Sequence, residues 1–258
     1  WYMKIATVVG ARPQFIKEAA VARKLRKEHK EILIHTGQHY DIDMSDVFFD
    51  ELDIPYPDYN LGISGGTHGK MTGTMIAAIE EVLLKERPDR LLVYGDTNST
   101  LAGALAAVKL HIPVCHVEAG IRLGTLTNPE EVNRICTDHV SSLLMYCTES
   151  SMVNLKNEGL FENAYFVGDP MYDAFLYFSE YADKKQLKKM NLPDRFYYMT
   201  CHREENCSVS SLTEILDAVN SLDAPTVYPV HPRNKEIVKR ICESHNFKNV
   251  KLLPPVGY

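Results

Sequence analysis

The chain has 258 residues, of which 45% are hydrophobic and 24% charged, and its 28 basic and 34 acidic side chains give a formal net charge of −6. These values are ordinary for a globular protein and exclude a disordered, collagen-like or low-complexity chain. The acidic balance argues against a nucleic-acid partner, and no apolar run approaches the roughly 20 residues that a membrane span needs. Because the apolar run Ile5–Val9 is also too short for a signal peptide, we expect a cytoplasmic protein without a membrane partner.

The first two-thirds of the chain alternates short β-branched runs with longer amphipathic runs. The strands that this pattern predicts are Ile5–Val9, Ile32–His35, Arg90–Tyr94, Val114–Val117, Leu143–Cys147 and Tyr165–Val167. The predicted helices between them are Gln14–Glu28, Met71–Lys85, Thr100–Leu110, Glu130–Val140 and Ser151–Glu158. Strands joined by crossover helices form a parallel sheet covered on both faces. The pattern therefore predicts a doubly wound α/β domain over residues 1–168.

A second series follows a helical linker expected at about Met171–Met190. Its predicted strands are Phe196–Thr200, Thr226–Val230 and Val250–Leu253, and its predicted helices are Ser211–Ser221 and Lys235–Ser244. Three parallel strands without a closing helix would leave a bare face and an open edge. We therefore interpret residues 169–258 as a linker helix and an incomplete second α/β domain.

Ligands of open parallel sheets bind beyond the carboxyl ends of the strands, so the residues there are candidates for function. Gly10 follows the first predicted strand and permits a tight turn, and Pro13 suits the start of a helix. Arg12 and Lys17 add positive charge to a helix N-terminus, which already favours anions. A generic strand–helix turn is the alternative interpretation of this segment.

The loop after the second predicted strand, Thr36-Gly37-Gln38-His39-Tyr40-Asp41, is polar. His35, His39, Asp41 and Asp43 could be drawn as metal ligands, but they lack the helical spacing that presents two histidines together. We therefore expect this loop to contact a polar ligand, and we expect no metal.

Two acids stand at the tips of neighbouring strands. Asp96 follows Arg90–Tyr94, and Glu118 follows Val114–Val117. Two such acids suit proton transfer on both sides of a substrate carbon. The structural alternatives are that Thr97 or Asn98 caps the next helix and that Glu118 forms a salt bridge with Arg122.

The segment that begins at Asn128 carries a third candidate acid. Asn128 suits the N-cap of a helix, Pro129 the first turn, and Glu131 the reciprocal acid of a capping box. That accounts for Glu131 but not for Glu130, which shares a helix face with Arg134 four residues later. We therefore favour Glu130 as the functional acid.

In the second domain, His202 and His231 follow two neighbouring predicted strands, each with an arginine close by. This pairing suits an oxygen-rich anionic ligand such as a diphosphate.

Together these segments resemble the non-hydrolysing UDP-N-acetylglucosamine 2-epimerases. The resemblance covers almost the whole chain and includes, in order, the blocks GARP, TGQHYD, GDTNST, HVEAGIR, PEEVNR, CHREEN and YPVHP. It implies two Rossmann-like domains of the glycosyltransferase-B type and epimerisation at C2 of a UDP-linked N-acetylhexosamine. The reaction would eliminate UDP to a 2-acetamidoglucal and add UDP again, with no cofactor and no metal.

The resemblance also implies roles for individual residues. Its catalytic positions are matched by Asp96, Glu118, Glu130 and His202, and its basic positions near the nucleotide by Arg12, Lys17 and Arg134. Gln38 and His39 match a loop that, in bacterial members, contacts a second UDP-sugar acting as an allosteric activator. Family members are commonly homodimers.

Three departures from the family pattern stand out. Leu123–Asn128 lacks an Asp-Arg-Met run, His202 is followed by Arg-Glu-Glu-Asn rather than Arg-Arg-Glu-Asn, and the sequence stops before an Asp-Ser-Gly-Gly segment that holds the uridine in relatives. The last departure leaves an inactive fragment as one alternative. Another is a hydrolysing 2-epimerase that shares the same acids but releases N-acetylmannosamine and UDP. The blocks TGQHYDIDMSDVFF, GTHGK and HPRNK also resemble a subgroup that acts on UDP-2,3-diacetamido-2,3-dideoxyglucuronate.

Overall fold

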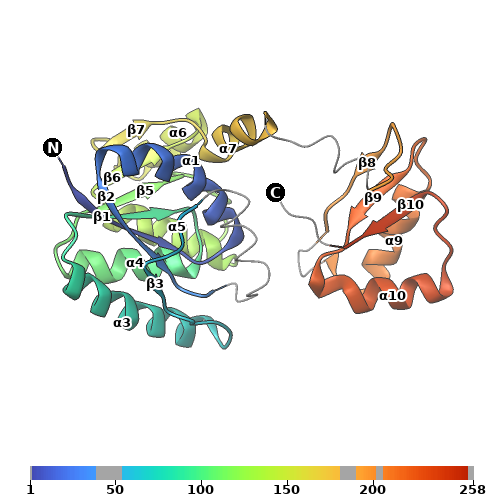
Figure 1. The fold of residues 1–258 in the computed structure, drawn as a ribbon, viewed down its shortest axis with the longest axis horizontal. Helices are drawn as coiled ribbons and strands as arrows, with labels where there is room; N and C mark the ends of the chain where they lie inside the picture. The colour runs from blue at the N-terminus through green and yellow to red at the C-terminus, as the bar shows by residue number, and fades with distance from the viewer. Residues whose placement is uncertain (1, 39–53, 181–189, 202–205, 255–258) are drawn as a thin grey trace. The chain divides into compact units, whose positions relative to one another are not determined.

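The computed structural model describes residues 2–38, 54–180, 190–201 and 206–254. The chain divides into two compact units, Trp1–Glu180 and Tyr181–Tyr258. Each unit is an α/β structure built around a parallel sheet (Figure 1). Within the described ranges, no helix is both long enough and apolar enough to cross a membrane.

The sheet of the first unit has the strand order β3-β2-β1-β4-β5-β6-β7, and every neighbouring pair is parallel. Its strands are β1 (Lys4–Val9), β2 (Lys30–His35), β3 (Tyr59–Asn60), β4 (Arg90–Tyr94), β5 (Val114–Val117), β6 (Leu143–Tyr146) and β7 (Ala164–Phe166). Its helices are α1 (Arg12–Glu28), α3 (His68–Glu86), α4 (Asn98–Lys109), α5 (Pro129–Val140), α6 (Glu149–Asn157) and α7 (Pro170–Ser179). The strand order reverses beside β1 and β4, where a ligand crevice is expected.

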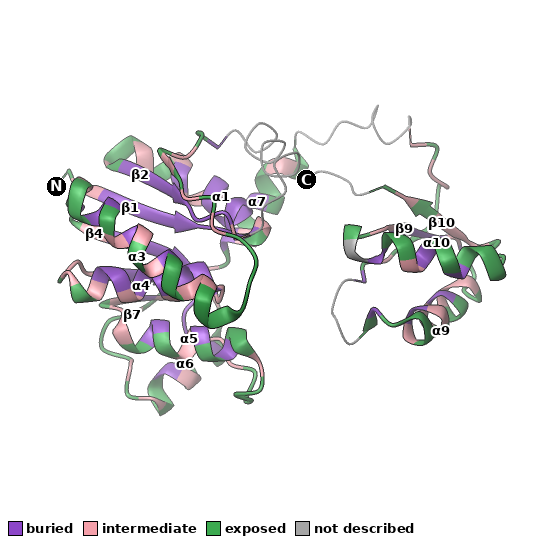
Figure 2. Ribbon diagram, turned by 90° about the horizontal axis from the view of Figure 1, so that it is seen from below, coloured by how far each residue is buried: buried purple, intermediate pink, exposed green. Residues whose placement is uncertain are grey.

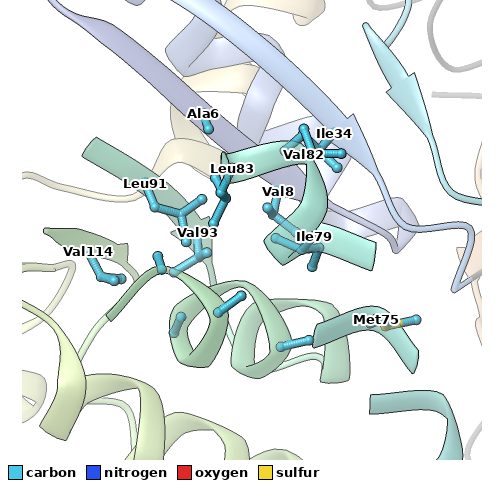
Figure 3. Close-up of a cluster of buried hydrophobic side chains, with 14 of the residues drawn as sticks. Ala6, Val8, Ile34, Met75, Ile79, Val82, Leu83, Leu91, Val93 and Val114 are labelled. Atoms are coloured by element: carbon cyan, nitrogen blue, oxygen red, sulfur yellow. The ribbon is translucent and has the colours of Figure 1, made fainter. Parts of the chain in front are cut away.

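Helices cover both faces of this sheet. On one face α1 and α7 pack over β1, β4 and β5, and on the other α3 and α4 pack over β1, β2 and β4 (Figure 1). The central strands are buried almost throughout, whereas the helices bury the face toward the sheet (Figure 2). Val8 and Val93 of the sheet meet Met75 and Ile79 of α3 in this core (Figure 3).

The small residues of α4 let this helix approach the sheet closely. A Cβ at Gly103 would lie 3.3 Å from side-chain carbons of both Val8 and Val93. Ala102, Ala106 and other alanines of α4 are fully buried against the same layer, and they add little bulk. The close packing fixes the start of α4, and with it the loop that follows β4.

The expected strands and helices of the first unit are present, with their ends shifted by at most three residues. The short strand β3 was not expected. The expected linker helix at 171–190 is described only in part: α7 covers Pro170–Ser179 and packs on α1, and residues 181–189 of the expected helix lie outside the described residues. Ala174 of α7 is buried, and the guanidinium carbon of Arg23 in α1 lies 3.4 Å from the ring centroid of Tyr177. The first unit therefore extends to residue 180 rather than 168.

The second unit contains β8 (Tyr197–Tyr198), β9 (Thr226–Pro229) and β10 (Val250–Leu253), in the order β10-β9-β8 and all parallel. Its helices are α9 (Val209–Asn220) and α10 (Lys235–Ser244), and a short 3₁₀ helix, η2 (Pro232–Asn234), precedes α10. Leu212 and Leu216 of α9 form the core with Tyr228 of β9 and with Val238 and Ile241 of α10. These elements agree with the second series expected from the sequence.

Two glutamates are buried together between α1 and the sheet. Glu18 is fully buried, and its Oε2 accepts a 2.7 Å hydrogen bond from the hydroxyl of Tyr94. Glu31 accepts hydrogen bonds from Thr7 Oγ1 (2.5 Å) and Arg26 Nε (2.6 Å). Burial, and then the charge of Glu31, raise the pKa of Glu18 well above its ordinary value.

Glu18→Gln is expected to stabilise the first unit more at pH 8 than at pH 5. A raised pKa means that the contribution of Glu18 to stability is present below its unfolded pKa and is lost as the pH rises through the folded pKa. Glutamine is neutral at every pH, so the free energy of unfolding of the variant does not fall with pH for this reason. Urea unfolding at the two pH values measures the difference between variant and wild type, with Glu28→Gln, an exposed change in the same helix, as the control. A difference that does not grow with pH would contradict the assignment.

Candidate active site

The candidate active site lies at the carboxyl ends of β1, β2, β4 and β5, where the sequence analysis expected it. Four loops meet there, and they follow these four strands in the chain. The residues that the structure brings together include Lys17, Gln38, Asp96, Glu118 and Arg134.

Asp96 is held by helix α5. Its carboxylate forms a salt bridge with Arg134, and its backbone carbonyl accepts a 2.8 Å hydrogen bond from Asn133 Nδ2. The second Asn133 contact, 3.1 Å to Asn98 Oδ1, ties the same helix to the start of α4. The side chain of Asp96 is 26% exposed, so a substrate can still reach its carboxylate.

Glu118 stands in a strained backbone conformation directly after β5. Its φ is +73°, in the left-handed region that non-glycine residues rarely adopt. The carboxylate forms a salt bridge with Lys17 of α1, whose side chain is only 9% exposed. The alternative salt bridge between Glu118 and Arg122 is wrong, because Arg122 pairs with Asp138 (2.8 Å) and Glu158 (2.7 Å) instead.

The residue before Asp96 lies against the carboxylate of Glu118. Gly95, directly before Asp96, has a φ of +63°, and a Cβ there would lie 3.1 Å from Glu118 Oε2 and 3.4 Å from Lys17 Nζ. The turn after β4 therefore lies against the carboxylate that follows β5. This arrangement places two acids and two bases at one edge of the sheet.

The turn after β1 is closed by the side chain of Gln14. Gln14 Oε1 accepts hydrogen bonds from the backbone N–H groups of Gly10 (2.8 Å) and Ala11 (3.0 Å). A Cβ at Gly10 would lie 2.2 Å from both Ser99 Oγ and Thr36 Oγ1, so only glycine fits there. Arg12, the first residue of α1, is half-buried in the same region.

Gln38 contacts the start of α4 directly. Its Oε1 accepts hydrogen bonds from the backbone N–H (3.0 Å) and the hydroxyl (2.6 Å) of Ser99. Asn98 Nδ2 lies 3.1 Å from His68 Nδ1, so α3 also reaches this point. His39, the other expected contact of the activator loop, lies outside the described residues, as do the suggested metal ligands Asp41 and Asp43.

The adjacent residues Glu130 and Glu131, in the first turn of α5, have different surroundings. Asn128 caps the helix as predicted, its side chain accepting from the N–H groups of both glutamates. The capping-box role of Glu131 is wrong: its Oε1 instead accepts from the backbone N–H groups of Leu123 (2.8 Å) and Gly124 (2.9 Å). Glu131 is buried at 2% exposure and holds the preceding loop, whereas Glu130 is exposed.

In the second unit the candidate residues follow β8 and β9. His202 lies outside the described residues, and His231 is exposed. Asn234 is fully buried and donates from Nδ2 to the carbonyl of Cys201 (2.8 Å) and to the hydroxyl of Tyr228 (3.0 Å). It therefore fixes the residue directly before His202.

Sequence reasoning missed two asparagines that organise the site of the first unit, Asn98 and Asn133, and it also missed Asn234, which holds the carbonyl of Cys201 in the second unit. The position of Asn133, beside Arg134 in the first turns of α5, was the available signal. Its partners, however, are a carbonyl and a side chain more than 30 residues away.

The fold and the site define the class of protein. An α/β enzyme with parallel sheets in two units presents carboxylates paired with basic residues at the edge where open sheets bind their ligands. The chain belongs to the UDP-N-acetylglucosamine 2-epimerase family, whose model matches residues 23–258. It is therefore an isomerase of this family, with the expected glycosyltransferase-B type of fold.

Several relatives carry this conclusion. A UDP-N-acetylglucosamine 2-epimerase homolog of Methanococcus maripaludis is 49% identical over 99% of this chain and 74% of its own length. The UDP-2,3-diacetamido-2,3-dideoxy-D-glucuronate 2-epimerase of Pseudomonas aeruginosa is 48% identical over 99% of this chain and 73% of its own length. The crystal structure of the Methanocaldococcus jannaschii UDP-GlcNAc 2-epimerase, in complex with UDP-GlcNAc and UDP, is 40% identical, with a TM-score of 0.90 over 99% of this chain and 74% of that one.

Proposed function

We propose that this chain interconverts UDP-N-acetylglucosamine and UDP-N-acetylmannosamine by inverting the configuration at C2 of the sugar. The observation that carries the proposal is the joint presence of Asp96–Arg134 and Lys17–Glu118 at one edge of the sheet. The likeness to a structure that binds UDP-GlcNAc supports this choice of substrate.

The proposed reaction has two halves. In the first, a carboxylate removes the C2 proton while the C1–O bond to the diphosphate breaks, which gives UDP and a 2-acetamidoglucal. In the second, a proton returns to the opposite face of C2 and UDP adds again at C1. Acids on both sides of C2 are what such a sequence requires.

We assign the proton transfers and the stabilisation of positive charge at C1 to Asp96, Glu118 and Glu130. His202 assists the departing diphosphate, and Arg12, Lys17, Arg134 and His231 hold its charge. Arginine and lysine suit this task because they donate charge-assisted hydrogen bonds to phosphate oxygens. We further propose that Gln38 and His39 contact a second UDP-sugar that acts as an activator, and that the protein is a homodimer.

A second substrate is favoured by one comparison. The relative from Pseudomonas aeruginosa that acts on UDP-2,3-diacetamido-2,3-dideoxy-D-glucuronate is 48% identical, against 34% for the Escherichia coli K12 UDP-N-acetylglucosamine 2-epimerase. The same elimination and re-addition at C2 would apply to that uronate, so the acids keep their roles.

Proton NMR in deuterated water tests the proposal and separates the alternatives. With UDP-N-acetylglucosamine, we expect deuterium at C2 and a growing UDP-N-acetylmannosamine signal. Free N-acetylmannosamine would instead identify a hydrolysing enzyme. Exchange with the diacetamido uronate alone would identify the second substrate, and no exchange with either sugar would contradict an active 2-epimerase.

A further inference from the structure

One fully buried histidine connects the two strand tips that carry the acids. His116 lies in β5, and neither its ring nor the carboxylate of Asp138 in α5 is exposed. His116 Nδ1 lies 2.6 Å from Asp138 Oδ1, and Nε2 lies 2.7 Å from the backbone carbonyl of Gly95. Both ring nitrogens therefore face oxygen atoms that accept hydrogen bonds.

This geometry makes the ring of His116 a bridge between the turn after β4 and helix α5. A backbone carbonyl can only accept, so Nε2 donates to Gly95. On the other side of the ring, Asp138 Oδ1 lies against Nδ1, while its Oδ2 takes hydrogen bonds from Gly120 N (3.0 Å) and from Arg122 (2.8 Å).

The carboxylate that contacts the ring is itself held in place. Arg122 lies 2.8 Å from Asp138 Oδ2 and donates two 2.7 Å hydrogen bonds to Glu158. His139, next to Asp138 in α5, lies 3.1 Å from Glu158 and is largely exposed. The buried ions are thus paired and hydrogen-bonded, which is the condition for keeping charges inside a protein.

We propose that His116 is a positioning residue that aligns Asp96 and Glu118 for the C2 chemistry by joining the turn after β4 to helix α5. This inference rests on the proposed function. Its ring holds the carbonyl of Gly95, the residue before Asp96, and its backbone lies two residues before Glu118. Through Asp138 it also anchors α5 one turn after Arg134, the partner of Asp96.

The network acts on the loop after β5 as well. Asp138 accepts from the N–H of Gly120, which follows the strained residue Glu118 by two positions. Losing the His116–Asp138 contact would free both turns at once. Small displacements of catalytic groups cost about 10²-fold in rate.

Steady-state kinetics of His116→Gln test the proposal. We expect kcat to fall about 10²-fold while KM changes little, because His116 does not touch the nucleotide-binding residues. His139→Gln is the matched control, since this exposed histidine of the same network does not reach Gly95, and it should keep the wild-type kcat. A kcat for His116→Gln equal to that of the control would overturn the positioning role.

Nitrogen-15 NMR of the wild-type protein provides a test that needs neither substrate nor variant. We expect Nε2 of His116 to carry a proton, and an unprotonated Nε2 would overturn its hydrogen bond to Gly95. Because this result does not depend on turnover, it stands apart from the proposed function, which fails if the wild-type protein exchanges no C2 proton.

Discussion

Glu118→Gln is expected to lower kcat for C2 epimerisation by about 10²–10⁴-fold, the usual contribution of a positioned general acid or base. The amide has nearly the same shape as the carboxylate but cannot take up a proton from C2. The side chain is aimed by a left-handed backbone that the change does not alter. Deuterium incorporation at C2, followed by proton NMR, measures the rate directly.

The control for this prediction uses Lys17. Removing the charge of Glu118 leaves the Lys17 ammonium, which is 9% exposed, without its carboxylate partner, so the single variant also loses stability. Adding Lys17→Met removes that stranded charge and should restore the melting temperature. Because Lys17 is also proposed to hold the diphosphate, exchange in the double variant is compared with exchange in Lys17→Met alone, and it should be lower. Equal exchange in these two variants would show that Glu118 only balances Lys17.

The neighbouring glutamates of α5 should respond to the same substitution in different ways. Glu130→Gln is expected to reduce kcat by about 10²-fold or more with little effect on stability, because Glu130 is exposed. Glu131→Gln should retain more activity but lower the unfolding free energy by about 1–3 kcal/mol, since its buried carboxylate accepts from two backbone N–H groups.

Turnover assays and urea unfolding of both variants, made side by side, separate the two effects. The two positions are matched controls for each other because they are adjacent in the same helical turn. The reverse pattern, with Glu131→Gln inactive and Glu130→Gln destabilised, would move the catalytic role to Glu131.

Much of the fold could be predicted because its signals are local. β4, β5, β10 and α10 begin and end where the alternation of β-branched and amphipathic runs placed them. β3 has only two residues and carries no such pattern. The helix α7 was expected as part of a linker because a helical pattern says nothing about its packing partner, which is α1.

Of the predicted site residues, Lys17, Asp96, Glu118 and Arg134 lie at one edge of the sheet, but the contacts between them could not be predicted. Asp96 and Glu118 could be predicted because they follow β4 and β5 directly. Their basic partners, Arg134 of α5 and Lys17 of α1, are distant in sequence and come close only in the folded sheet. The same limit explains two wrong predictions, the salt bridge between Glu118 and Arg122 and the capping-box role of Glu131. Both predictions paired residues that are close in sequence. His116 carried no signal at all, since its role depends on acceptors more than 20 residues away.

The space at Gly10 has a consequence for how the sequence can vary. Three segments meet at Gly10, where the side-chain oxygens of Thr36 and Ser99 leave no room for a methyl group. Gln38, which follows Thr36 in the same loop, accepts a hydrogen bond from the hydroxyl of Ser99. Positions 10, 36 and 99 are therefore not independent. A larger residue at any of them requires a smaller one at another, so we expect these positions to covary across related sequences.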